Sequence, residues 1–178
     1  LDQVSVVANK IVSELRALGI TVKFDNRDTY KPGWKFNEYE LKGVPVRIAI
    51  GPKDLEKGTV EVARRDTLEK EFLQQTDVAN KVEHLLEQIQ INLLTKSQTF
   101  AEENTRVVDS WEEFKDTLEN KPGFIYAHWD GTNETEERIK AETKATIRCI
   151  PMDNPQEEGK CVFSGQPSKQ RVLFAKAY

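Results

Sequence analysis

The chain is poor in the residues that form disulfide frameworks, metal centres and common catalytic sites. Its 178 residues include only two Cys, two His and one Met. Two cysteines cannot build a disulfide framework, so we expect a protein of a reducing compartment. No apolar run approaches the roughly 18 residues of a membrane-spanning helix. Walker, Gly-x-Ser-x-Gly and His-Glu-x-x-His motifs are missing, which argues against catalysis by the chemistry of those families.

Charged residues are abundant, but their signs nearly balance. Lys and Arg number 26 and Asp and Glu number 30, which gives a net charge of −4. This balance argues against polyanion binding over the whole surface and still allows a local basic face. The chain begins Leu1-Asp2-Gln3 and its only methionine is Met152. We therefore expect it to be part of a longer cytoplasmic protein that lacks at least an N-terminal region here.

Strand and helix patterns alternate along the chain and predict an α/β fold with a mixed or parallel sheet covered by helices. We expect two domains, over residues 1–100 and 106–178, separated by a polar stretch at 101–105. In the first domain the predicted elements are a helix over 4–18, a strand over 21–24, a helix over 34–41, a strand over 44–50, a turn at 51–52, a strand over 59–65 and a helix from about 76 past 96. In the second they are a helix over 111–118 with Ser110 as N-cap, a strand over 123–129, a helix over 133–143, strands over 146–150 and 171–176, and an acidic loop over 153–159.

Five residues of the first domain form the most informative cluster: Phe36, Glu40, Arg47, Lys53 and Asp54. An aromatic ring, two acids and two bases suit reading a nucleobase better than breaking a bond. An Arg fork can donate two hydrogen bonds to a guanine edge, and a carboxylate can accept from guanine or cytosine N–H groups. RNA sequence is read mostly on unstacked bases that lie on aromatic or Arg planes. The alternative is that these charges near turns are merely solvated.

Two neighbouring arginines admit two interpretations. Arg64 and Arg65 either contact RNA phosphates or form salt bridges at a strand end. With Lys53, Lys57 and Lys70 they would form a basic rim if all five share a face. The histidines, His84 and His128, are interpreted as surface or packed residues.

The cysteines of the second domain occur in a pattern that is typical of a degraded zinc site. Cys149 is followed by Asn154, and Cys161 by Ser164. Structural zinc normally takes four Cys or His ligands, and neutral amide and hydroxyl groups replace a thiolate poorly. Cys149 and Cys161 are therefore interpreted as the remnant of a four-ligand site.

The chain resembles the C-terminal part of prolyl-tRNA synthetase, a class II aminoacyl-tRNA synthetase, in the form with a C-terminal extension. The first likeness is the run Gly-x-Lys-Phe-x3-Glu-Leu-Lys-Gly-Val-Pro-x-Arg-Ile-x2-Gly-Pro-Lys-Asp over residues 33–54. The second is the group Thr-Ile-Arg-Cys-Ile-Pro at 146–151, Gly-Lys-Cys at 159–161 and the ending at 174–178. The resemblance covers nearly the whole chain. It implies an anticodon-binding domain, with a mixed sheet flanked by helices, followed by a smaller α/β C-terminal domain related to a zinc-binding one.

The resemblance implies that this part recognises the anticodon of tRNA(Pro), whose second and third positions are guanines. Phe36 would stack on a base, Glu40 and Asp54 would accept hydrogen bonds from guanine edges, and Arg47 and Lys53 would donate to base or phosphate oxygens. A catalytic domain of the same polypeptide would join proline to the tRNA with ATP and Mg²⁺, in an enzyme that we expect to be a homodimer. The alternative is a stand-alone regulatory RNA-binding module built on a synthetase-like anticodon domain.

The extension departs from the family pattern at its cysteines. Members with zinc carry thiolates where this chain has Asn154 and Ser164, so we expect no cofactor in this part, with hydrogen bonds or apolar packing in place of the metal. The terminal carboxylate of Tyr178 is similar to one that approaches the catalytic domain in this family.

Overall fold

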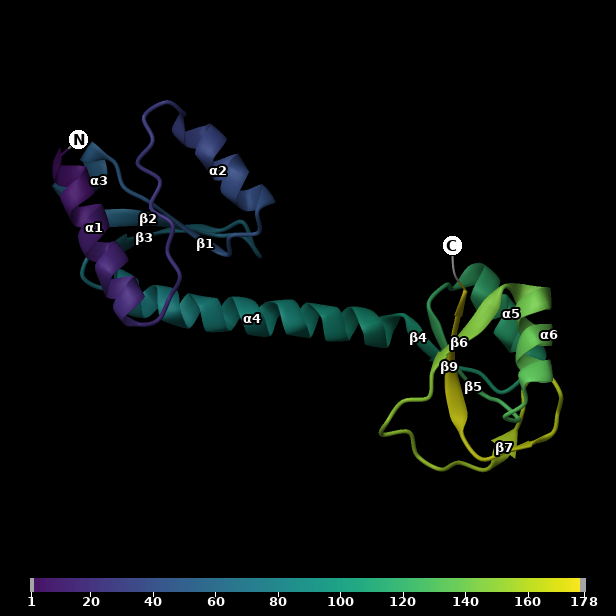
Figure 1. Cartoon of the computed structure of the whole chain (residues 1–178). Helices are drawn as coiled ribbons and strands as arrows, with labels where there is room; N and C mark the ends of the chain where they lie inside the picture. Colours follow the sequence, from purple (N-terminus) through teal and green to yellow (C-terminus); the bar gives the residue numbers. More distant parts are fainter. Residues whose placement is uncertain (1, 177–178) are drawn as a thin grey trace. The chain divides into compact units, whose positions relative to one another are not determined.

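The computed structural model describes residues 2–176, which form two compact units divided between Lys96 and Ser97 (Figure 1). Helices accompany a sheet in both units, so the predicted α/β class is confirmed. The predicted domain boundaries, 1–100 and 106–178, stay predictions. Within the described range, every helix is too short or too polar to cross a membrane. The expectation for Tyr178 concerns a residue outside that range.

The first unit is built on a three-stranded antiparallel sheet with the order β1-β2-β3. Its strands are β1 (Val46–Ala49), β2 (Thr59–Arg64) and β3 (Lys70–Gln74), and its helices are α1 (Asp2–Ala17), α2 (Pro32–Leu41), α3 (Pro52–Lys57) and the start of α4 (Val78–Glu103). The register pairs Arg47 with Ala63 and Ile48 with Val62. Since side chains alternate along a strand, these pairs lie on opposite faces of the sheet.

The two faces of this sheet have different partners. Val60 and Val62 are buried in one apolar core with residues of α1 and α4, for example Leu15 and Val82. Arg47 and Glu61 alternate with these core positions and belong to the opposite face. Figure 1 shows α2 on the other side of the sheet from α4. The sheet therefore separates an apolar core from a polar face that α2 accompanies.

Three elements of the first unit differ from the sequence expectation. The strand predicted over 21–24 was wrong, because this stretch has no strand pairing and instead contributes Val22 to the core. The turn predicted at Gly51-Pro52 is the start of α3, where Pro52 occupies the first turn and the Asp54 carboxylate accepts from the Gly51 N–H. Gly58, at φ +66°, ends α3 and leads into β2. Strand β3 was not predicted.

The second unit contains a four-stranded mixed sheet with the order β4-β5-β9-β6, in which only the β4–β5 pair is parallel. A separate two-stranded sheet joins β7 and β8. The elements are β4 (Thr105–Val107), α5 (Trp111–Asn120), β5 (Phe124–His128), α6 (Asn133–Thr143), β6 (Ala145–Cys149), β7 (Gly159–Lys160), β8 (Pro167–Ser168) and β9 (Arg171–Lys176). The predicted hinge at 101–105 consists of the end of α4 and the start of β4.

Two phenylalanines lie in the largely aliphatic core of the second unit. Phe114 and Phe174 are fully buried, with their rings edge to face at a centroid distance of 5.2 Å. The N-cap prediction for Ser110 is confirmed, since its side chain accepts from the Glu113 N–H. The helix predicted over 133–143 and the strand predicted over 171–176 are also confirmed.

Candidate nucleic-acid interface

The centre of the candidate interface is a contact between Phe36 of α2 and Arg47 of β1. The guanidinium carbon of Arg47 lies 3.6 Å from the centroid of the Phe36 ring. This is a cation–π contact, which orients the planar guanidinium against the face of the ring. The structure thus brings together two of the residues that the sequence singled out.

The protein partners of Arg47 do not satisfy all of its N–H donors. Its Nη1 donates to Glu61 at 3.2 Å, and its side chain is 13% exposed. Its Nε is buried and has no hydrogen-bond partner among the described residues. Arg carries five N–H donors, so the bond to Glu61 does not exhaust this guanidinium, although the buried Nε itself cannot reach a ligand.

Glu40 and Arg65 meet at a hollow between α2 and the segment that follows β2. The Arg65 Nε donates to the backbone oxygen of Glu40 at 2.9 Å, which leaves the Glu40 carboxylate out of this bond. The hollow has a volume of about 570 Å³ and is lined by Asn37, Glu40, Leu41, Arg65 and Leu68. Since Phe36 and Glu40 are one turn apart on α2, both belong to the same side of that helix.

Lys53 and Asp54 occupy the first turn of α3, directly after β1. Asp54 Oδ2 accepts from the Gly51 N–H at 2.8 Å, so one carboxylate oxygen serves the helix start. Lys53 is exposed. Among the described residues, no hydrogen bond or ion pair joins Lys53 or Asp54 to Arg47. The structure therefore places these two residues near the end of β1 without bonding either of them to Arg47.

Arg64 is engaged in a structural ion pair. Its guanidinium donates two hydrogen bonds to the Asp66 carboxylate, at 3.0 and 2.7 Å, and Asn92 of α4 donates to the same carboxylate at 2.9 Å. The hydrogen bond from Arg64 is the main reason why the pKa of Asp66 falls to about 2, and the bond from Asn92 adds to it. Lys70 lies 3.8 Å from Glu61. Part of the predicted basic rim thus has acidic partners.

The sequence did not single out Phe72 or Glu61. Phe72 of β3 is paired directly with Glu61 of β2, so both belong to the face of the sheet that carries Arg47. Phe72 is 65% exposed. Sequence periodicity offered no signal for Phe72, because Leu73 is the one buried position in β3 and its neighbours Lys70, Glu71 and Gln74 are all exposed.

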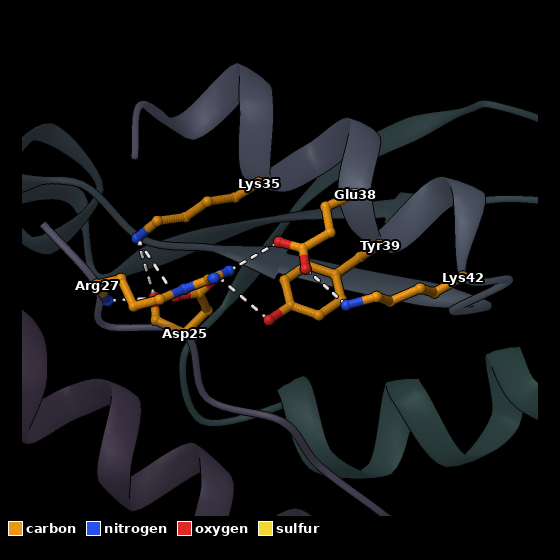
Figure 2. A network of polar contacts seen from close by, with 6 residues as sticks. All are labelled: Asp25, Arg27, Lys35, Glu38, Tyr39 and Lys42. Carbon is orange, nitrogen blue, oxygen red and sulfur yellow. Dashed lines mark hydrogen bonds and ion pairs between the residues drawn. The ribbon is translucent and has the colours of Figure 1, made fainter. Parts of the chain in front are cut away.

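A network of charged residues in the segment before α2 was also missed (Figure 2). Arg27 donates to the Asp25 carboxylate at 2.8 and 2.6 Å and to Glu38 at 2.8 Å. Tyr39 donates to the same Asp25 carboxylate at 3.2 Å, and Lys42 donates to Glu38 at 2.5 Å. The sequence predicted only a polar turn at 25–28.

The residues around the two cysteines do not fit a zinc ion. Cys149 is exposed and Cys161 is buried, and the described residues contain no group of three His, Cys, Asp or Glu side chains that could hold a metal. Asn154 donates to the Arg171 carbonyl at 2.6 Å, and Ser164 donates to an Asp130 carboxylate oxygen at 2.5 Å. Hydrogen bonds to the rest of the unit therefore occupy the two positions where a zinc site would need thiolates.

The two histidines have ordinary surroundings. His84 is exposed on α4 and pairs with Gln88 at 2.9 Å. His128 is 3% exposed, and its Nδ1 lies 3.1 Å from the Ser168 hydroxyl. The Ser168 hydroxyl is itself buried and donates to the Gln170 carbonyl at 2.9 Å, so this Ser–His contact is a structural hydrogen bond rather than an exposed nucleophile beside its base.

Comparison with known proteins finds two family models that match separate parts of the chain. Residues 2–85 match the family described as "Anticodon binding domain", and residues 111–178 match "Prolyl-tRNA synthetase, C-terminal". Three curated relatives, each described as a proline–tRNA ligase, align with all 178 residues. The one from Christiangramia forsetii is 60% identical, and those from Porphyromonas gingivalis and Flavobacterium johnsoniae are each 58% identical. The chain spans 36% of the length of each of these relatives.

Proposed function

Because the chain consists of an anticodon-binding domain followed by the C-terminal domain of prolyl-tRNA synthetase, we propose that it selects tRNA(Pro) for an enzyme that ligates proline to that tRNA with ATP. The observation that carries the proposal is the Phe36–Arg47 contact, an aromatic ring and a guanidinium joined on the polar face of a small sheet. Such a pair suits an unstacked base, since the ring offers a stacking face and the arginine offers donors.

Specificity for guanine requires acceptors as well as donors, and the elements that carry Phe36 and the residues just after β1 also carry acids. A guanine edge presents N–H donors that a carboxylate can accept and acceptors that an arginine can bind. We assign the acceptor role to Glu40 and Asp54 and the donor role to Arg47 and Lys53. Arg65 would contact phosphate, whereas the ion pair with Asp66 gives Arg64 mainly a structural role.

The bond-making chemistry belongs to a part of the enzyme outside these 178 residues. That part would hold ATP and Mg²⁺ and would activate proline, and we propose that it also makes most of the contacts of a homodimer. The second unit would support the fold by apolar packing and hydrogen bonds rather than by zinc.

The test is tRNA(Pro) binding by the 178-residue chain and its variants, measured by fluorescence anisotropy at fixed salt concentration. Arg47→Ala and Glu40→Ala should each weaken binding by about 1–3 kcal/mol, the cost of losing one good base contact. Lys10→Ala is the matched control, because Lys10 is an exposed base on α1 whose one ion-pair partner is Glu14. It should change the affinity by a few tenths of a kcal/mol at most. Site variants that bind as tightly as the control would refute the assignment.

A further inference from the structure

Helix α2 is attached to its unit without the apolar packing that holds the other elements. None of its ten residues is buried, and none belongs to the core that α1, β2, β3 and α4 share. Its N-cap residue, Lys31, makes no side-chain hydrogen bond to the first turn. A helix of this length is marginal in water by itself, so tertiary contacts must hold α2 in place.

Besides the Phe36–Arg47 contact and the Arg65 bond to the Glu40 backbone oxygen, the contacts that hold α2 include a polar group that converges on Asp25, as Figure 2 shows. Arg27 binds both oxygens of the Asp25 carboxylate and extends to Glu38 of α2. The Tyr39 hydroxyl donates to the same carboxylate, and Lys35 Nζ donates to the Asp25 backbone oxygen at 3.2 Å. Three residues of α2 are thus bound to two residues of the preceding segment.

The chemistry of these bonds suits orientation as well as attachment. The Asp25 side chain is only 9% exposed, and its hydrogen bonds from Arg27 hold the pKa of that carboxyl far below its usual range. Asp25 is therefore ionised at neutral pH. The paired charge-assisted bonds fix Arg27 against Asp25 within the segment before α2. The bonds that reach the helix, from Arg27 to Glu38 and from Tyr39 to the Asp25 carboxylate, are directional as well, so they favour one rotation of α2 over others.

The rotation of α2 decides what its other residues meet. Lys35 and Tyr39, one turn apart, bind Asp25, whereas Phe36 and Glu40, also one turn apart, meet Arg47 and line the hollow. Each residue of an α-helix turns the chain by about 100°. A helix that loses the first set of contacts keeps fewer restraints on its rotation, among them the Phe36–Arg47 contact and the Arg65 bond to the Glu40 backbone oxygen, so the geometry of the second set becomes less well defined.

We propose that Asp25, Arg27 and Tyr39 are positioning residues for anticodon recognition, because they hold α2 in the orientation in which Phe36 and Glu40 meet an unstacked base. The inference rests on the proposed function of this unit. We call α2 docked when it is held against the sheet by the network. The inference predicts that the network changes tRNA affinity by changing the docked fraction of α2, and that Asp25, Arg27 and Tyr39 make no contact with the RNA.

The experiment compares Asp25→Asn with the wild-type chain in two measurements, hydrogen exchange of the 32–41 peptide and tRNA(Pro) affinity. Asp25→Asn should lower the protection of α2 and leave that of β2 unchanged, because α2 lies outside the core. The apparent Kd equals the intrinsic Kd divided by the docked fraction, so a docked fraction of one tenth raises Kd about tenfold. The loss of docked population and the rise in Kd should agree.

Three further variants make the test specific. Tyr39→Phe removes one hydroxyl and should give a smaller change of the same kind, which keeps the test available if Asp25→Asn folds poorly. Glu14→Gln removes the acid of the Lys10–Glu14 pair on α1 and should change neither the hydrogen-exchange protection of α2 nor the affinity for tRNA(Pro). Adding Asp25→Asn to Phe36→Ala should weaken binding less than adding it to the wild type, since both changes affect the same contact.

A comparison of two tRNA transcripts distinguishes a misplaced α2 from partial unfolding of the chain. A partly unfolded sample binds every tRNA less well in proportion, whereas a misplaced α2 should reduce the preference for tRNA(Pro) over a transcript whose two anticodon guanines are replaced. Unchanged protection of α2 would overturn the inference. So would lowered protection with unchanged affinity and preference, and in that case the proposed function would stand. A wild-type chain without any preference would instead contradict the proposed function.

Discussion

The ion pair between Asp66 and Arg64 should make the stability of the first unit depend on pH in a defined window. Asp66 joins the β2–β3 turn to α4, because it accepts from both Arg64 and Asn92, and its side chain is 2% exposed. Its pKa falls from 3.8 to about 2. A shift of this size corresponds to roughly 2 kcal/mol, and solvent screening lowers the expected contribution to about 1–2 kcal/mol.

The sign follows from the lowered pKa. A carboxyl group that is more acidic in the folded state contributes its full stabilisation above its unfolded pKa, near 3.9, and loses it as pH falls through the folded value. Asp66→Asn should therefore lower the free energy of unfolding most at pH 7. The difference from wild type should shrink between about pH 4 and pH 2.

The assay is urea unfolding followed by hydrogen exchange of β2 and α4 peptides, because one optical signal would average the two units. Glu87→Gln is the matched control, since it makes the same acid-to-amide change at an exposed position of α4 and should cost less than about 0.5 kcal/mol. Equal stability of Asp66→Asn and wild type at pH 7 would refute the reasoning. So would a difference that stays constant down to pH 2.

Three other outcomes follow from the structure. Phe72→Ala should leave the free energy of unfolding nearly unchanged, because the ring is 65% exposed. If the ring stacks on a base, the same change should weaken tRNA(Pro) binding by about 1–3 kcal/mol in anisotropy titrations. Phe114→Ala should destabilise the second unit by about 3–5 kcal/mol in urea titrations, because Phe114 is fully buried. Chelator or added zinc should leave the melting temperature unchanged, and a shift on either treatment would mean that Cys149 and Cys161 recruit ligands from elsewhere.

Local signals explain which elements could be predicted from the sequence. Helix α6 agrees with its predicted range, and α5 begins after Ser110 as expected, since apolar spacing and capping residues lie within the elements themselves. Strand β3 was missed because its charged residues and outward Phe72 hide the alternation that identifies a strand. The segment 21–24 has the composition of a strand but no neighbouring strand to pair with, and strand propensity depends on such neighbours.

The residues of the candidate site were likewise only partly predictable from local sequence patterns. The resemblance of residues 33–54 to a known family pointed to Phe36 and Arg47, and the structure brings them into contact. The Asp25 network could not be predicted from the sequence, because its bonds join residues 11 and 14 positions apart with no periodic pattern between them. Contacts between an irregular segment and a helix depend on the tertiary fold, which residue spacing alone does not reveal.

The most direct test of the account is whether the wild-type chain distinguishes tRNA(Pro) by its anticodon. The measurement compares the Kd of the 178-residue chain for tRNA(Pro) with its Kd for the same transcript carrying adenines in place of the second and third anticodon guanines. Each lost guanine contact should cost about 1–3 kcal/mol, so the substituted transcript should bind at least about tenfold more weakly. Equal affinity for the two transcripts would contradict the claim that this chain reads the anticodon.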